Sequence, residues 1–355
     1  MSNIKQANSF DFVRFSAALL VLYSHAFAIG GAPEPVIAGF CSLGSLGLLI
    51  FFSISGYLVS MSWLSDGSVV RFATRRSLRI FPALTVVILL STFVLGPIVT
   101  TMPMQAYFHH RATYQYLANI GLYVSYYLPG CFEHAPIPNA VNGSLWSLPV
   151  EVLMYIFLGG LGWASLLKRR AFMVVFCGGV GCAALYFLRS TPLTLPFLDL
   201  IISPHPDPIL FLGMELHQVM LVAPYFWAGC LIYLYRDRVK LTMSATIIVF
   251  MIMLLLPPGD LRNVCSWLAI PYITLAFCTQ SDRLFRIPTS VGDLSYGIYI
   301  YAFPIQQTIY FYWHTKYSIL QMTAITAGLV LICAFISWHL IENPSLRLKP
   351  SRRGR

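Results

Sequence analysis

Two ionisable residues, Arg14 and His25, lie eleven positions apart in the first apolar segment of the chain. Eleven residues make about three turns of an α-helix, so a helix directs both side chains to one face, about 16 Å apart along its axis. A histidine whose pKa is near its usual value of about 6.5 suits general-base catalysis on a hydroxyl nucleophile. The arginine, at the cytoplasmic end, could hold an anionic donor. The alternative is a snorkelling arginine and a core histidine bonded to a carbonyl oxygen.

Arginine alone supplies the positive charge of the segment RFATRRSLRIFPAL, at residues 71, 75, 76 and 79. In a helix Arg75, Arg76 and Arg79 lie within about one turn of one another, so their guanidinium groups can converge. Guanidinium groups are planar, multidentate donors suited to phosphate, and coenzyme A carries phosphate groups. We predict that these three arginines and Arg14 bind acyl-CoA. The alternative is a purely topological role, which lysine would serve equally well.

Glu151 lies in the segment GSLWSLPVEVLMYI, which enters a predicted membrane span from outside. Counted from the outer ends of their spans, Glu151 and His25 are both expected about 8–9 Å deep. Ionisable residues inside spans are costly and are candidates for function. The equal depth predicts a catalytic pair in which the Glu151 carboxylate orients or charges His25, provided that the first and fourth spans are neighbours. The alternative is a glutamate that bonds elsewhere within the bundle.

The composition places these residues in a membrane. Of 355 residues, 57% are hydrophobic and only 10% are charged, whereas soluble domains carry about 25% charged residues. A hydrocarbon core of about 30 Å needs roughly 20 apolar residues per helix. We predict an all-α integral membrane protein of about ten transmembrane helices, at residues 10–30, 42–63, 80–102, 145–166, 171–188, 219–235, 243–257, 263–279, 291–312 and 319–341.

The basic residues predict the orientation. With the N-terminus in the cytoplasm, 19 of the 23 lysines and arginines lie in cytoplasmic segments or helix ends, as the positive-inside rule requires. Both termini are therefore expected in the cytoplasm, with an N-terminal segment at 1–9, a transmembrane domain at 10–341 and a basic tail at 342–355. Because the positive charges are spread over short loops, no nucleic-acid partner is expected. The first span lacks a small-residue cleavage site and is not interpreted as a signal peptide.

Two long segments, 103–144 and 189–218, are predicted outside the membrane. The first includes an aromatic stretch at 114–127, interpreted as an interfacial helix before an irregular loop. Long loops often form lids or binding surfaces, so the acceptor is expected from outside. The eight cysteines have no metal-binding spacing, and no metal site is predicted. Cys41 and Cys131 both map to the outer side, which leaves a disulfide between them open.

Six segments, in order along the chain, resemble motifs of the membrane acyltransferase family 3. They are FDFVRFSAALLVLYSHAF with Asp11 three residues before Arg14, GLLIFFSISG ending in Ser55 and Gly56, RRSLRIFPAL, SLWSLPVEVLMY, LSYGIYIYAFPIQQ with Pro304, and LIENPS with Glu342. The resemblance implies a ten-helix bundle that uses cytoplasmic acyl-CoA, usually acetyl-CoA, to modify extracytoplasmic carbohydrate. It assigns catalysis to His25 and donor handling to Arg14, Arg76 and Arg79.

Two features depart from the family pattern. Ala302 stands where many relatives carry a histidine, so the role of that histidine in acceptor or donor binding is not transferred. The esterase-like C-terminal domain that is fused to some members is missing, so the protein is expected to act alone or to pass its acyl group to a separate periplasmic protein.

The sequence therefore predicts a multi-pass protein of the bacterial inner membrane, in contact with membrane lipids. It transfers an acyl group from acyl-CoA, a co-substrate, to a hydroxyl of an extracytoplasmic glycan or lipid-linked saccharide, with no permanently bound cofactor. Pro304 is expected to kink the ninth span by removing a backbone donor. The alternative function is a proton-coupled transporter or flippase of a glycan or anionic lipid, with His25 and Glu151 as a proton relay. A structural subunit of a glycan-export complex would explain neither His25 nor the arginine cluster.

Overall fold

The computed structural model describes residues 9–188, 211–280, 285, 287–288 and 290–350, and it is an all-α integral membrane protein. Each predicted span overlaps one helix of the described chain: α1 (Ser9–Ile29), α2 (Leu43–Leu64), α3 (Val69–Leu90), α7 (Ser147–Trp163), α8 (Arg170–Leu188), α10 (Leu216–Leu234), α11 (Met243–Leu255), α12 (Asp260–Gln280), α13 (Ser295–Trp313) and α14 (Ile319–Ser337). Eight helical runs of the described chain are long and apolar enough to cross a membrane. Two helices are not among them, because α11 has 13 residues and α13 is rich in tyrosine and glutamine.

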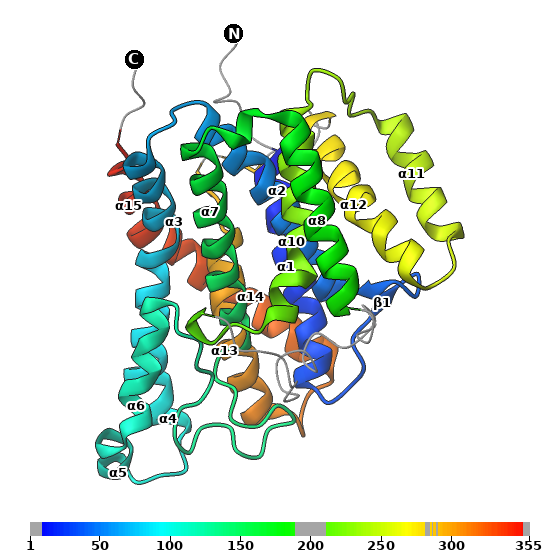
Figure 1. Cartoon of the computed structure of the whole chain (residues 1–355). Coiled ribbons are helices and arrows are strands. Elements are labelled where there is room, and N and C mark those ends of the chain that lie inside the picture. The colour runs from blue at the N-terminus through cyan, green and yellow to red at the C-terminus, as the bar shows by residue number, and fades with distance from the viewer. Residues whose placement is uncertain (1–8, 189–210, 281–284, 286, 289, 351–355) are drawn as a thin grey trace.

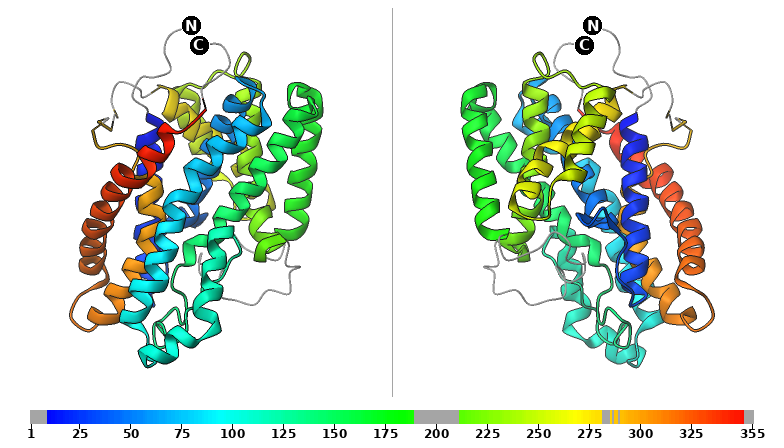
Figure 2. Two further views of the ribbon diagram at one scale, coloured as in Figure 1. Left: turned by 90° about the vertical axis from the view of Figure 1, so that its left-hand side faces the viewer. Right: turned by 90° about the vertical axis from the view of Figure 1, so that its right-hand side faces the viewer.

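The bundle is built around α1, α2 and α10. α1 packs against α2 and α13, α2 packs against α10 and α12, and α14 packs against α13 and α1. Figure 1 shows α3 and α7 along one side of the molecule and α11 and α12 along the other. α1 begins, and the short helix α15 (Asn343–Arg347) ends, at the same end of the bundle (Figure 2).

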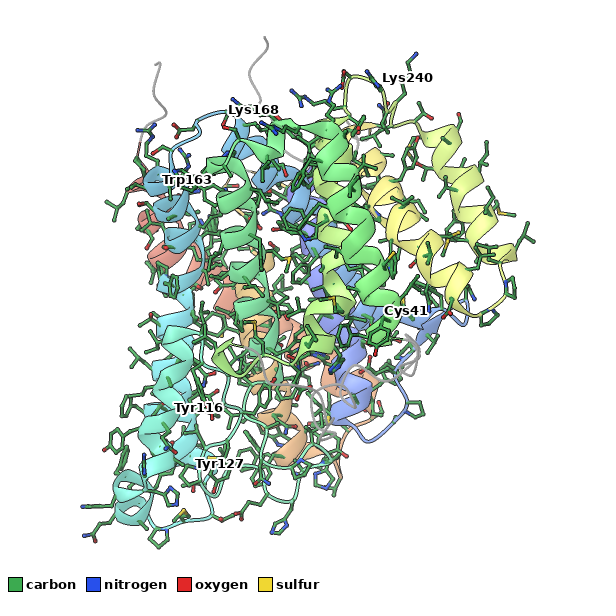
Figure 3. The ribbon with its side chains drawn as sticks, in the orientation of Figure 1. Cys41, Tyr116, Tyr127, Trp163, Lys168 and Lys240 are labelled. Carbon is green, nitrogen blue, oxygen red and sulfur yellow. The ribbon has the colours of Figure 1, made fainter. Side chains whose placement is uncertain are left out.

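The two ends of the bundle differ in their side chains. Lys168 and Lys240 lie at the end where α1 begins, whereas Tyr116 and Tyr127 lie toward the opposite end (Figure 3). Lysine is expected on the cytoplasmic side of a membrane protein and tyrosine near a membrane–water interface. In the predicted orientation, which stays a prediction, the end of the bundle with Lys168 and Lys240 faces the cytoplasm.

Helix α3 begins earlier than predicted, at Val69 instead of residue 80. The Ser68 side chain caps it by accepting a hydrogen bond from the Arg71 N–H, and a π-helical turn at Ser91–Leu95 continues into α4 (Gly96–Val99). Arg75, Arg76 and Arg79 therefore lie within the helix itself, where they were expected just before it. A membrane helix tolerates them because their side chains reach carboxylates or aromatic rings, described below.

The segment between α4 and α7 is a compact cap on the bundle. It contains α5 (Met104–His109), α6 (Arg111–Gln115) and a 3-10 helix at Tyr116–Gly121, and another 3-10 helix at Gly143–Trp146 leads into α7. The interfacial helix predicted at 114–127 thus ends near Gly121, because Leu122 adopts a left-handed conformation with φ of 68°. Tyr107, Tyr116 and Phe132 are fully buried, so this segment packs into the bundle.

The disulfide left open between Cys41 and Cys131 is not formed. Cys41 lies in β2 (Cys41–Ser42), which pairs with β1 (Val36–Ile37). Both thiols are free and buried, and the Cys131 Sγ contacts the carbonyl oxygens of Gly96 and Pro129.

Helices α2 and α10 touch backbone to backbone through two glycines. A Cβ atom at Gly56 would lie 1.8 Å from the carbonyl oxygen of Phe226, and a Cβ atom at Gly229 would lie 2.2 Å from that of Ser53. No larger residue fits either position without moving a helix, as in other membrane helix pairs that approach through small residues. Gly56, expected to be a supporting residue, thus sets the distance between these helices.

One prediction for the C-terminal third needs correction in detail, and another is not tested. α13 runs from Ser295 to Trp313 with Pro304 inside it, and the kink expected at Pro304 stays a prediction. After α14, a π-helical turn at Trp338–Glu342 leads directly into α15, so the basic tail predicted from residue 342 begins within a helical run. Glu342 is buried there, because its carboxylate turns toward α3.

Candidate active site

A cavity of about 110 Å³ lies among α1, α2, α3, α7 and α13. Its polar lining consists of Arg14, Ser55, Arg76, Arg79, Ser147, Glu151, Tyr155, Ser295, Tyr296 and Tyr299. Most small-molecule sites have volumes of about 300–1,000 Å³. The cavity therefore fits a narrow chain but must widen to admit anything larger.

Two of the predicted donor-binding arginines share acidic partners in this site. The Arg79 Nη2 atom lies 2.7 Å from the Asp293 carboxylate, and its Nη1 atom lies 3.6 Å from that of Glu342. The Arg14 Nη2 atom lies 2.5 Å from Asp11, one turn earlier in α1, and 3.4 Å from Asp293. Asp293 thus joins guanidinium groups from α1 and α3. The ion pairs with Asp293 and Glu342 compensate the charges of the two arginines within the bundle.

Arg76 differs from these two arginines. Among the residues that the structure describes, it has no carboxylate within ion-pair distance. Its guanidinium carbon lies 5.8 Å from the centre of the Phe72 ring and 5.6 Å from that of Tyr155. Aromatic faces stabilise a cation without neutralising it. Arg76 therefore presents an uncompensated positive charge at the cavity wall.

Arg75 does not join this group, and the predicted convergence of three arginines is wrong on this point. Its Nη2 atom lies 2.7 Å from Asp66, which also accepts hydrogen bonds from Arg71. The hydrogen bond from Arg71, aided by Arg75 and opposed by burial, lowers the pKa of Asp66 to about 2. Arg75 does not line the cavity, because it pairs with Asp66 in the turn that links α2 to α3.

Glu151 lies on the arginine side of the cavity. Its carboxylate accepts hydrogen bonds from the Ser55 hydroxyl, at 3.2 Å, and from the Tyr155 hydroxyl one turn later in α7. α7 packs against α2, α3 and α10, whereas α1 packs against α2, α12, α13 and α14. The predicted pair of Glu151 and His25 is therefore not formed, since the first and fourth spans are not packed neighbours. Ser55 supports the site through this contact.

His25 is fully buried and lies one helical turn beyond the cavity. The deep end of the cavity is marked by a 2.6 Å hydrogen bond between the hydroxyls of Ser147 and Tyr299. One turn further along α13, the Phe303 ring packs edge-on against the His25 ring, with 5.6 Å between ring centres. A donor arm that extends along the cavity away from the arginines would therefore point toward His25.

A second, apolar groove of about 450 Å³ runs between α3 and α7. Its walls include Val69, Ile156 and Trp163, which are largely exposed on the outside of the bundle. Arg76, Ile80 and Tyr155 line both spaces. These three side chains therefore separate the polar cavity from the apolar groove.

The whole of this region falls within a known family. The model of the acyltransferase-domain family matches residues 7–338, which include Arg14, His25, the arginine cluster and Glu151. The chain belongs to this acyltransferase family. It is 32% identical over 345 residues to an O-acetyl transferase of Shigella phage Sf6, covering 95% of this chain and 96% of the relative. It is 29% identical over 364 residues to nodulation protein 10 of Rhizobium leguminosarum bv. viciae, covering 97% of this chain and 94% of the relative. No solved structure matches the chain.

Membership of the acyltransferase family confirms the resemblance inferred from the six motifs. The candidate site also contains residues that sequence reasoning missed, above all Asp293 and Tyr155. Asp293 lies inside the predicted ninth span, so the rule that flagged Arg14 and His25 would have flagged it too. Tyr155 follows Glu151 by four residues, the helical spacing of a side-chain pair.

Proposed function

We propose that this acyltransferase moves an acyl group across the membrane, from acyl-CoA on the cytoplasmic side to a hydroxyl of a glycan or lipid-linked saccharide on the outer side. The observation that carries the proposal is Arg76, which lines the cavity beside Arg14 and Arg79 and has no carboxylate partner among the described residues. An unneutralised guanidinium in a membrane bundle favours an anionic ligand. Acyl-CoA supplies phosphate for this cation and a narrow pantetheine arm for the cavity.

The positions of the positive charges support this direction of transfer. α3 begins at the end of the bundle where Lys168 lies, and its arginines are in its first three turns (Figures 1 and 3). The positive-inside rule supports a cytoplasmic location for that end. Arg14 and His25 are eleven residues apart on α1, or about 16 Å along the axis. The arm of the donor spans this length, so phosphates stay inside while the thioester reaches the outer half.

His25 can act at the thioester in two ways. As a general base it takes the proton of the acceptor hydroxyl, whose oxygen attacks the thioester carbonyl carbon. The carbon–sulfur bond then breaks, and the leaving thiolate of coenzyme A takes up a proton. As a nucleophile, the imidazole instead attacks the carbonyl carbon, releases the thiolate and holds the acyl group until the hydroxyl removes it. Neither route requires a bound metal or a permanent cofactor.

The names and sources of the relatives bear on which acyl group is transferred and in which membrane. One is named an O-acetyl transferase, which supports acetyl as the transferred group. They come from a phage and a bacterium, and we place this protein in the bacterial inner membrane on that basis. The acceptor is then a surface glycan or its lipid-linked precursor, with a separate periplasmic protein as the remaining alternative acceptor.

The proposal is tested with purified protein in lipid nanodiscs, radiolabelled acetyl-CoA and a bacterial surface polysaccharide as acceptor. Wild-type protein should release coenzyme A in step with acetylation. His25→Ala should lose at least a hundredfold in turnover and still bind coenzyme A, because His25 does not line the cavity. His109→Ala, on the exposed end of α5, is the matched control and should remain active.

Two results would contradict the proposal. One is a well-folded His25→Ala variant that keeps more than a few per cent of turnover. The other is glycan movement in proteoliposomes without release of coenzyme A, which is the expected behaviour of a transporter. Acid quenching before acceptor addition separates the two routes, since label on the protein appears only if His25 carries the acyl group.

A further inference from the structure

Asp293 occupies the position between the two arginines that a donor phosphate would need. Its Oδ2 atom lies 2.7 Å from Nη2 of Arg79 and 3.4 Å from Nη2 of Arg14. Its Oδ1 atom accepts hydrogen bonds from the hydroxyl and the N–H of Ser295, at 2.5 and 3.3 Å. The carboxylate is buried at the start of α13. One of its oxygens is thus fixed by α13, and the other bridges α1 and α3.

The charges of Arg14 and Arg79 are already balanced without a donor. Arg14 and Arg79 are paired with Asp11, Asp293 and Glu342, and Glu151 also faces the cavity. Only the Arg76 guanidinium has no such partner among the described residues. The donor carries several negative charges. Adding them to a site that already holds four carboxylates is costly, because an unneutralised anion away from water is expensive.

Asp293 is the carboxylate whose departure frees most positive charge. Asp11 pairs with Arg14 within one turn of the same helix, and among the arginines that the structure describes Glu342 pairs with Arg79, at 3.6 Å. Asp293 contacts both arginines and lies in the turn just before α13, so a rotation of its side chain releases both at once. Phosphate and carboxylate oxygens are bound by the same guanidinium geometry.

We propose that Asp293 is an internal counter-ion that holds the phosphate position of the empty enzyme and is displaced from Arg79 and Arg14 when acyl-CoA binds. This inference rests on the proposed use of acyl-CoA. Asp293 returns to the arginines as coenzyme A leaves, so it weakens donor binding and speeds release of the product. It is a positioning and specificity residue and takes no part in bond making.

The test measures the binding of coenzyme A itself, which needs no acceptor, to full-length protein in nanodiscs. Asp293→Asn should bind coenzyme A at least tenfold more tightly than wild type, because it cannot neutralise the arginines. Asp293→Glu, which keeps the charge, should bind no more tightly than wild type. Glu342→Gln removes a more distant partner of Arg79 and should tighten binding by a smaller factor, about two- to fivefold. Asp237→Asn, which removes a surface partner of Arg170, is the control and should leave binding unchanged.

The outcomes separate this inference from the proposed function. Wild-type protein that binds no coenzyme A contradicts the proposed function. If wild type binds coenzyme A but Asp293→Asn binds it equally or more weakly, Asp293 instead arranges the arginines for phosphate, and the inference is overturned. Should Asp293→Asn fail to fold, Asp293→Glu serves instead: tighter binding of coenzyme A than in wild type, with the negative charge kept, overturns the inference.

Discussion

The side chain of Asn142 donates a hydrogen bond of 2.9 Å to the carbonyl oxygen of Ile300. Ile300 precedes Pro304 by four residues, and proline has no N–H with which to satisfy that carbonyl. The Asn142 Oδ1 atom also accepts a hydrogen bond from the Ser144 N–H. Pro304 thus leaves the Ile300 carbonyl oxygen free to accept a hydrogen bond from Asn142, in the segment that leads into α7. This hydrogen bond lies about one turn from Phe303, whose ring packs on His25.

Asn142→Ala should lower the free energy of unfolding by about 1–3 kcal/mol, because it leaves a buried carbonyl without a donor. In a Pro304→Ala background the loss should be smaller by about 1 kcal/mol, since the new N–H at position 304 can bond to Ile300. Denaturant unfolding in detergent of the two single variants and the double variant measures this coupling. Equal losses in both backgrounds would show that Pro304 does not create the Asn142 contact.

Arg76→Lys should raise KM for acetyl-CoA at least tenfold with a smaller change in kcat. Lysine keeps the charge but loses the planar fork that binds phosphate and stacks on Phe72 and Tyr155. Arg75→Lys is a matched control at the adjacent position, where the guanidinium binds Asp66 outside the cavity. Its KM should stay within about twofold of wild type. Equal effects of the two substitutions on KM would indicate that the arginines determine membrane topology and do not bind the donor.

Glu151→Gln should leave unchanged the part of the pH profile of kcat/KM that is governed by ionisation of His25. The carboxylate bonds to Ser55 and Tyr155 and not to His25, so removing its charge does not remove a partner of the imidazolium. The substitution should act on the donor side instead, through the Tyr155 ring that faces Arg76, and raise KM severalfold. A shift of this part of the profile to lower pH in the variant would instead support the direct His25–Glu151 pair that equal depth predicts.

Asp66→Asn should destabilise the protein in a pH-dependent way. The pKa of Asp66 is about 2 in the folded state and about 3.9 in the unfolded state. The carboxylate therefore contributes stability that is fully present above about pH 5 and is lost as the pH falls toward 2. Unfolding of wild type and variant across this range should give curves that differ at neutral pH and converge in acid. A constant difference between the curves would contradict the ion pair with Arg71 and Arg75.

Helix positions were predictable because apolar length and basic loop residues report directly on the membrane. The pairing of Glu151 was not predictable, because depth gives one coordinate of a side chain and neighbouring helices give the other two. His25 and Glu151 share a depth by residue count, yet their helices do not pack together. Which helices touch depends on contacts such as Gly56 on Phe226, which no single segment encodes.

The arginine cluster illustrates the same limit at short range. Helical spacing correctly brings Arg76 and Arg79 to the cavity and would bring Arg75 close to them. Asp66, nine residues before Arg75 and outside the helix, draws it away instead. The Arg79–Asp293 contact joins residues 214 positions apart, and only the folded bundle brings them together.

The glycine contacts between α2 and α10 have a consequence for how the membrane stays sealed. Backbones in direct contact at Gly56 and Gly229 cannot separate or slide without losing that fit, whereas α3 and α7 are parted by an apolar groove of about 450 Å³. Under the proposed use of acyl-CoA, the cavity of about 110 Å³ beside them has to widen, and the groove leaves α3 and α7 more room to move than the α2–α10 pair has. We therefore expect the α2–α10 pair to stay closed to protons and ions while the donor enters and leaves.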